Sequence, residues 1–274
     1  MRTWLAVVTV AIGLGIGFSG AAESDSPLAS DKQWQQARKD LAQGKAGEAK
    51  AAFDELLKRH PNEADLHLFL GMSLLRLRDP RAAILAIKKA IEVNPSHVEA
   101  RTLLGYVELE VRGDADAAIK EYRKVIELRA GSPEAHSNLA VAQKKKGDLD
   151  QAIVSLNRAL ELKPGFAAAL TTRGSIYAEQ YKWTEARRDF EQALRLNPDD
   201  DGALYGLSQA LREARDYGGA QGALSELIAR SGNFVYWLEW GRIGLIRYWW
   251  VLLSITIALV ARARFKKART PANG

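Results

Sequence analysis

Hydrophobic and polar positions follow a helical period between residues 133 and 166. Two segments of this stretch carry their apolar residues on one side: Leu139, Ala140 and Ala142 in the first, and Ala152, Ile153, Leu156, Ala159 and Leu160 in the second. The pair Gly147-Asp148 interrupts the pattern between them, and Pro164 ends the second segment. The pattern therefore predicts two short amphipathic helices joined by a tight turn.

The same pattern returns along the chain with a period of 34 residues and one inserted residue. Six alanines share one register, namely Ala49, Ala83, Ala118, Ala152, Ala186 and Ala220. Four residues after each comes a bulky residue: Phe53, Ile87, Tyr122, Leu156, Phe190 and Leu224. The first helix of each pair has a small residue in one slot: Ala37, Gly71, Gly105, Ala140, Gly174 and Ser208. Small residues let two helices approach closely, and the bulky residue fills the groove of the next repeat.

This period and these slots resemble the tetratricopeptide repeat (TPR) family. The resemblance covers residues 30 to 232, and it implies an all-α fold. The expected architecture is a right-handed TPR solenoid of six helix-turn-helix repeats plus a C-terminal capping or transmembrane helix. We expect the TPR domain at 31–232, with repeats at about 31–63, 64–97, 98–132, 133–166, 167–200 and 201–232.

Composition narrows the possible functions. The 274 residues include no cysteine, which excludes disulfides, thiolate metal sites and a cysteine nucleophile. The net charge of +6 comes from the two ends, because residues 23–242 hold 32 basic against 33 acidic residues, a net of −1. A neutral repeat body disfavours nucleic acid as a partner.

The first 22 residues have the layout of a secretory signal peptide. Arg2 precedes an apolar run from Trp4 to Phe18, and small residues end at Ala22, a plausible cleavage point. An uncleaved N-terminal anchor is the alternative, since residues 3–22 could span roughly 30 Å of hydrocarbon. The letters GxGxxG occur in this run, but no βαβ pattern surrounds them, so we do not interpret them as a dinucleotide site. Residues 23–30 form a polar linker.

The C-terminal residues predict a membrane anchor. Residues 233–242 are an aromatic segment that either caps the last repeat or lies at a membrane surface. Residues 243–261 carry one charge in 19 positions and would span roughly 28 Å as a transmembrane helix; a buried core helix is the alternative. The basic tail 262–274 predicts that this end is cytoplasmic. The predicted membrane-interface residues are Trp237, Trp240, Arg247, Tyr248, Trp249, Trp250, Arg262, Arg264, Lys266, Lys267 and Arg269.

No arrangement of residues predicts catalysis, so we expect no catalytic residue, no metal and no cofactor. The motifs HExxH, GxSxG, SxxK and GxxxxGK[ST] are absent. We interpret the four histidines, His60, His67, His97 and His136, as solvated or capping groups. Carboxylates such as Glu185, Asp189 and Asp148 are interpreted as helix caps and exposed faces.

The resemblance to the TPR family implies a concave groove, lined by the first helices, that binds protein or peptide segments. The residues implied to face it are Trp34, Arg38, Leu41, Leu68, Phe69, Met72, Leu75, Thr102, Leu103, Tyr106, Leu109, Ser137, Asn138, Val141, Lys144, Thr171, Thr172, Ser175, Tyr205, Gln209 and Arg212. Leu75 and Leu103 are equally well explained as core. The carboxylate clamp of chaperone-binding TPR proteins is absent, because only Asn138 matches it, and Thr102, Tyr106, Ala168 and Thr172 occupy its partner positions.

We therefore predict a non-enzymatic scaffold anchored in the inner membrane of a bacterial envelope, with its repeats in the periplasm and its C-terminus cytoplasmic. The alternative is a structural subunit of a membrane complex, held by the C-terminal helix, in which the repeats act as spacers. An enzyme is a remote third possibility. No small-molecule substrate is evident.

Overall fold

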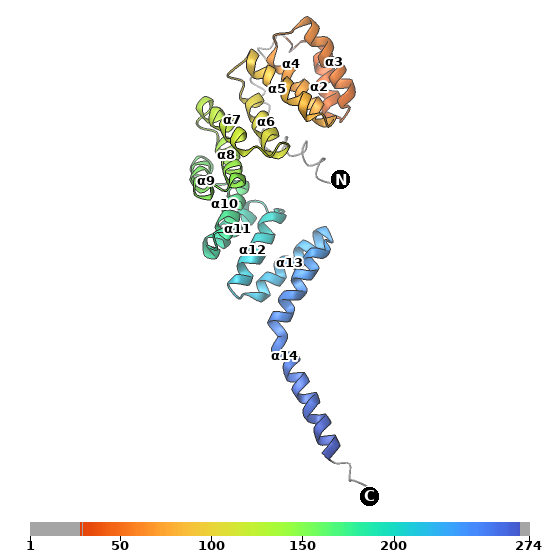
Figure 1. The fold of residues 1–274 in the computed structure, drawn as a ribbon, viewed down its shortest axis with the longest axis vertical. Coiled ribbons are helices and arrows are strands. Elements are labelled where there is room, and N and C mark those ends of the chain that lie inside the picture. The colour runs from red at the N-terminus through yellow and green to blue at the C-terminus, as the bar shows by residue number, and fades with distance from the viewer. Residues whose placement is uncertain (1–27, 29, 269–274) are drawn as a thin grey trace. The chain divides into compact units, whose positions relative to one another are not determined.

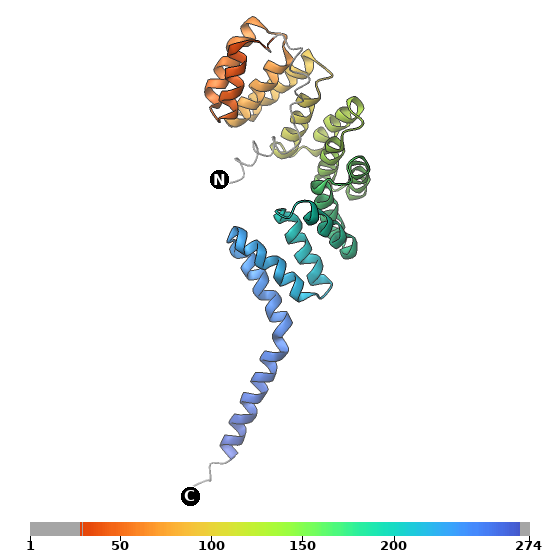
Figure 2. The same cartoon turned by 180° about the vertical axis from the view of Figure 1, so that it is seen from behind.

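The computed structural model describes residue 28 and residues 30–268. The predicted signal segment 1–22, most of the linker 23–30, and residues 269–274 with Arg269 lie outside the described residues. Within the described part every regular element is a helix, and no strand occurs. The chain divides into two compact units, Met1–Pro164 and Gly165–Gly274 (Figures 1 and 2).

The described part of the first unit holds eight helices that pack in sequence order as four pairs: α2 (Lys32–Ala42) with α3 (Ala46–Arg59), α4 (Ala64–Arg76) with α5 (Pro80–Val93), α6 (Val98–Glu110) with α7 (Ala115–Leu128), and α8 (Pro133–Lys146) with α9 (Leu149–Leu162). The second unit holds α10 (Ala167–Glu179), α11 (Trp183–Leu196), α12 (Asp201–Glu213), α13 (Tyr217–Ser231) and α14 (Phe234–Ala268). There α10 pairs with α11 and α12 with α13, and α14 packs against α13. Each of the six expected repeats thus contains two helices.

The core follows the small and bulky slots of the sequence. All six register alanines are fully buried. A Cβ atom built on Gly71 would lie 2.7 Å from Ile87, and one on Gly105 would lie 2.8 Å from the Tyr122 ring. The bulky side chain of a second helix therefore contacts the backbone of the first helix of its own repeat, and only a small residue fits there.

The turn inside each helix pair uses a left-handed residue. The six residues with φ between 59° and 93° at these turns are Gly44, Arg78, Gly113, Gly147, Tyr181 and Arg215. Glycine adopts this conformation without strain, whereas arginine and tyrosine do so at a cost of about 1 kcal/mol. The fold imposes the turn even in the three repeats that lack glycine.

The C-terminal segment differs from the prediction, because α14 is a single helix of 35 residues with no boundary at 242/243. Ile243, expected to begin the membrane span, is 2% exposed and packs in the core formed with α12 and α13. The Trp240 indole Nε1–H donates to Ser225 Oγ at 3.0 Å, and Arg247 Nη1 donates to Gln221 Oε1 at 3.3 Å. Trp240 and Arg247 therefore contact the repeats, and the first half of α14 covers the apolar side of α13.

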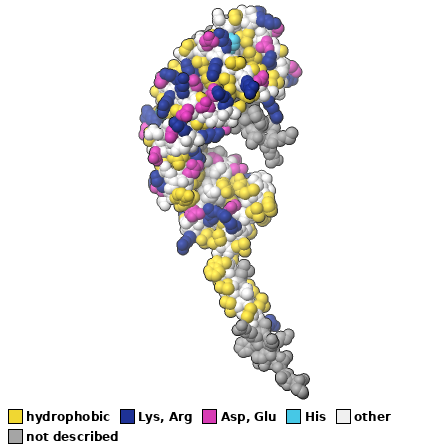
Figure 3. Space-filling model, in the orientation of Figure 1, with side chains coloured by type: hydrophobic (Ala, Val, Ile, Leu, Met, Phe, Trp, Pro, Cys, Tyr) yellow, Lys and Arg dark blue, Asp and Glu magenta, His cyan; other side chains and the backbone are white. Residues whose placement is uncertain are grey.

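Beyond this contact, α14 exposes large apolar side chains (Figure 3). They include Tyr248, Trp249, Trp250, Leu253, Ile255, Ile257, Leu259 and Val260. Taken singly, no helix in the described part of the chain has the length and apolarity of a membrane span. The two segments of α14, Phe234–Val251 and Leu253–Arg262, meet at an angle of 42°. Taken together, and judged by length and composition alone, they could form one membrane span.

Candidate partner-binding surfaces

The residues expected in the groove separate into a buried and a half-buried group. The buried group is Trp34, Leu41, Leu68, Phe69, Leu75, Leu103, Tyr106, Leu109, Ser137 and Asn138. The half-buried group is Arg38, Met72, Thr102, Val141 and Lys144 in the first unit, and Thr171, Thr172, Ser175, Tyr205, Gln209 and Arg212 in the second. Only the half-buried group is accessible to a partner without rearrangement of the helices.

An aromatic cluster in the first unit explains the burial at its N-terminal end. The Trp34 and Phe69 rings lie 4.9 Å apart at 82°, and Phe53 lies 5.7 Å from Trp34. Such edge-to-face pairs stabilise the contact between neighbouring helices. The Arg38 guanidinium lies 5.5 Å from the centre of the Trp34 ring and 5.4 Å from that of Phe69, so a cation covers the cluster at the surface.

One position of the repeat, which we call the inner slot, is partly accessible on the first helix of most repeats in the first unit. Arg38, Met72 and Val141 occupy it in α2, α4 and α8, and Tyr106 occupies it in α6, where it is buried. Lys144 is half-buried one turn after Val141. This inner slot therefore offers apolar contact from Met72 and Val141, with positive charge from Arg38 and Lys144.

The hydroxyl residues of the second unit hydrogen-bond within the fold. Thr171 Oγ1 donates a 2.7 Å hydrogen bond to the carboxylate of Asp200, and Asp200 is the N-cap residue of α12. Thr172 Oγ1 donates to the Ala168 carbonyl at 2.8 Å, and Ser175 Oγ donates to the Thr172 carbonyl at 2.7 Å. Because these donors already have acceptors, they contribute less to binding than the sequence suggests.

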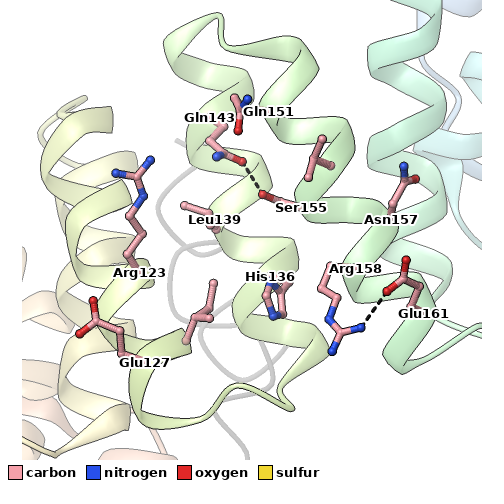
Figure 4. A pocket seen from close by; sticks show the side chains of 12 residues that line it. Arg123, Glu127, His136, Leu139, Gln143, Gln151, Ser155, Asn157, Arg158 and Glu161 are labelled. Carbon is pink, nitrogen blue, oxygen red and sulfur yellow. Dashed lines mark hydrogen bonds and ion pairs between the residues drawn. The ribbon is translucent and has the colours of Figure 1, made fainter.

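A pocket of about 740 Å³ opens in the first unit between α7 and α9, with α8 as its floor (Figure 4). Its walls carry both signs of charge, with Arg123 and Glu127 on α7 and Arg158 and Glu161 on α9. On its floor the buried Gln143 accepts a 2.7 Å hydrogen bond from Ser155. The sequence analysis missed this pocket, because most of its lining residues have the pattern of solvated faces. Of its three apolar lining residues, Ile126, Leu139 and Val154, only Val154 is strongly exposed.

Asp189 corrects the expectation of an exposed carboxylate. Its side chain is 2% exposed and accepts two hydrogen bonds of 2.7 Å, from Nε and Nη2 of Arg173. This bidentate pair joins α10 to α11 inside the second unit, and its geometry is that of a strong charge-assisted contact. Its role is to hold two helices together.

His97 was expected to be solvated or capping; it is the N-cap residue of α6, but its side chain makes no capping hydrogen bond and is buried. It precedes α6, is 9% exposed, and lies between two carboxylates. Its Nε2 is 3.1 Å from Asp65 Oδ1 on α4, and its Nδ1 is 3.3 Å from Glu99 Oε2. Burial would lower the pKa of His97, but the hydrogen bonds to Asp65 and Glu99 outweigh it and raise the pKa to about 9. The hydrogen bond from His97 lowers the pKa of Glu99 to about 2.

Because His97 is protonated in the folded state, we expect the free energy of unfolding to fall at alkaline pH. The unfolded state releases this proton near pH 6.5, whereas the folded state keeps it up to about pH 9. The stabilisation, on the order of 2–3 kcal/mol, is therefore complete below pH 6.5 and lost as the pH rises through about 9. Urea unfolding of the full chain in mild detergent at pH 6, 8 and 10 measures this loss. The variant His97→Gln should lack this pH dependence, and an equal slope in both proteins would contradict the assignment.

Two of the other three histidines, His67 and His136, donate from Nε2 to backbone carbonyl oxygens. His67 Nε2 lies 2.9 Å from the Pro61 carbonyl, and His136 Nε2 lies 3.3 Å from the Ala130 carbonyl. Throughout the described residues, no three His, Asp or Glu side chains are grouped so that they could hold a metal ion.

Comparison with known sequences establishes the class of protein. Three sequence models, all described as tetratricopeptide repeat, match residues 35–86, 70–133, 112–176 and 167–200. Together the matches run from 35 to 200, more than half of the chain, and the chain belongs to the tetratricopeptide repeat family.

Comparison with solved structures gives the particular proteins that it resembles. The crystal structure of MamA is 26% identical, with a TM-score of 0.54 over 59% of this chain and 94% of MamA. PilF of Pseudomonas aeruginosa (15% identical) and PilW, a type IV pilus biogenesis factor (17% identical), each have a TM-score of 0.67 over 77% of this chain and 96% of their own. No protein in the curated collection of sequences matches. The chain is thus a TPR protein-interaction scaffold similar to these proteins; TPR proteins bind protein or peptide partners and are typically non-enzymatic.

Proposed function

We propose that this chain is a membrane-anchored scaffold of the bacterial cell envelope, which holds protein partners on its repeats. The observation that carries the proposal is the second half of α14, where large apolar side chains are exposed around the helix. Trp249, Trp250 and Leu253 follow one another around it, and Ile257 and Val260 continue the apolar surface. A helix that is apolar all round is stable when lipid or protein surrounds it.

The contact between α14 and α13 moves the start of the proposed span. Ile243 and Arg247 belong to the repeat body, so the span begins at Tyr248 and its apolar part ends at Ala261. These 14 residues cover about 21 Å, less than the ~30 Å of a typical hydrocarbon core. Local thinning of the bilayer, and an Arg262 side chain that reaches back to the lipid head groups, accommodate such a mismatch.

The charges at the two ends support the proposed orientation. Arg262 begins a basic tail, which the positive-inside rule assigns to the cytoplasm. The signal-like residues 1–22 are consistent with export of the repeats. A single Val154→Cys substitution tests this orientation, because the natural chain has no cysteine and Val154 is exposed. A membrane-impermeant maleimide should label it in spheroplasts; labelling only after lysis would contradict a periplasmic repeat domain.

Charge in the span is expected to release the protein from the membrane. The double variant Leu253→Lys/Ile257→Lys introduces two lysines, each disfavoured by about 2.5–3.5 kcal/mol at the centre of a bilayer. Membrane flotation should show the variant in the soluble fraction. Leu85→Lys/Leu128→Lys is the matched control, since both leucines are exposed on repeat helices. Equal flotation of the two variants would refute membrane anchoring by α14.

Partner capture is proposed to use the inner slot, whose apolar and basic side chains suit an extended or helical peptide segment with acidic flanks. Changes at Phe69 or Tyr106 would act on folding, because both are buried. The variant Met72→Glu/Val141→Glu adds repulsive charge at half-buried positions, and it should reduce recovery of co-purified proteins at least about tenfold.

The control for capture is Leu85→Glu/Leu128→Glu, on the second helices α5 and α7. Circular dichroism checks that both variants keep their helices. If the inner-slot variant captures the same proteins as the control, the inner slot is not the binding surface. The structural-subunit alternative would then gain support, because the exposed face of α14 is a partner surface that does not depend on the inner slot.

A further inference from the structure

Four of the five leucines of α14 follow a period of seven residues. These four leucines, Leu238, Leu245, Leu252 and Leu259, occupy one heptad position. Four residues before each of them comes a second position of the heptad, held by Phe234, Gly241, Tyr248 and Ile255. In a helix these residues form one stripe, the a and d positions of a heptad repeat. A pattern sustained over four heptads is typical of a helix that pairs with another helix along its length.

This leucine stripe points away from the repeats. Tyr236 and Ile243, which pack in the core with α12 and α13, each lie two residues from the nearest members of the stripe. Two residues correspond to roughly 160° around a helix. Leu238, Leu245 and Leu259 are 58%, 63% and 61% exposed. The face opposite the repeat contact is therefore apolar and uncovered from the first turn of α14 onward.

The residues in and beside the stripe favour a close contact with an identical helix. Gly241 lies in the stripe, and a Cβ atom built on it would meet no atom within 4 Å, so another backbone can approach there. The flanking positions carry Val235, Trp237, Gly244, Trp249, Val251, Thr256 and Ala258, which are uncharged, and Arg242, the single charge among them. With only one flanking charge to select a different sequence, a stripe with one leucine per heptad is complementary to itself.

We infer that α14 pairs in parallel with α14 of a second copy of this chain, through the stripe that contains Leu238, Leu245 and Leu259. In a parallel pair each leucine meets its own counterpart across a two-fold axis. The parallel orientation rests on the proposed membrane anchoring, because two anchors with the same topology point the same way. An antiparallel pair would instead place Leu238 near Leu259 of the second copy.

Disulfide cross-linking of full-length single-cysteine variants in native membranes tests the pairing. A disulfide needs Cβ atoms about 3.5–4.5 Å apart, which only residues at the seam reach. Leu245→Cys and Leu259→Cys should give a covalent dimer on mild oxidation. Their neighbours Ile246→Cys and Val260→Cys, which are also exposed, should cross-link at least tenfold less. The two pairs lie on either side of the 42° bend of α14.

Each other outcome overturns the inference. Absence of cross-links at all four positions means that the stripe faces lipid or a different protein, and equal cross-linking means random collision. Efficient cross-linking between Leu238→Cys and Leu259→Cys chains, but not between like chains, means antiparallel pairing. Membrane flotation of the same variants shows whether they are still anchored. Cross-linking of the same cysteines in protein purified in detergent micelles shows whether the chains pair outside the bilayer. Together the two assays separate loss of anchoring from loss of pairing.

Discussion

Replacing Arg173 by methionine is expected to lower the free energy of unfolding by about 3–5 kcal/mol. Asp189 is buried and accepts both of its short hydrogen bonds from this guanidinium, so the variant leaves a carboxylate without its counter-charge inside the second unit. Removing one partner of such a pair costs more than the pair itself contributes, because the desolvated charge remains. Urea unfolding of the full chain in mild detergent measures the loss.

Two further variants separate the buried charge from the loss of an arginine side chain. Arg187→Met removes an arginine from the exposed pair with Glu191 on α11, and it should cost less than about 0.5 kcal/mol. Arg173→Met/Asp189→Leu removes both charges, and it should recover most of the lost stability. If the double variant were as unstable as Arg173→Met, packing rather than the unpaired carboxylate would be responsible.

Replacing Gly206 by alanine is the second large effect, an expected loss of about 1–3 kcal/mol. A Cβ atom at this position would lie 2.3 Å from Cζ of the Phe190 ring. The ring also lies against Gly174 of α10, so closely that a Cβ atom built there would be 2.9 Å from the ring. The ring therefore has no room to move toward α10. The overlap should outweigh the gain of about 1 kcal/mol that alanine brings to a helix. Thermal or urea unfolding measures the difference.

Gly222→Ala on α13 is the matched control, since its Cβ atom would meet no atom within 4 Å. This substitution should raise stability by up to about 1 kcal/mol through helix propensity alone. A double-mutant cycle with Phe190→Leu should show that Gly206→Ala costs less when the ring is absent. Equal effects of Gly206→Ala in both backgrounds would rule out the Phe190 contact as the cause.

The sequence was informative about the helix pairs because their determinants are local and repeated. An apolar stripe, a turn and a terminating residue recur every 34 residues, and the register alanines are all buried as this pattern requires. The positions of Arg78, Tyr181 and Arg215 were not recognisable as left-handed turns, because their residue types do not favour that conformation. Only the packing of the flanking helices imposes it.

The candidate surfaces were predicted less well, because exposure depends on residues that are distant in the sequence. Phe69 and Tyr106 face the expected side of their helices, yet the neighbouring helices cover them. His97 and Asp189 have residue types that are usually exposed, and each is buried because a counter-charge meets it, 32 residues away for Asp65 and 16 for Arg173. The pocket between α7 and α9 consists of side chains that look like three ordinary polar faces when each helix is considered alone.

By itself, then, the sequence determined the helical repeat, its register and the family, because a periodic pattern of small and large apolar residues can pack in few ways. The tertiary structure alone decided which side chains of that pattern stay accessible. It also decided that α14 is one helix, whose first half completes the last repeat. The physical reason is that accessibility and charge pairing are set by what a neighbouring helix brings into contact, and a period in the sequence does not contain that information.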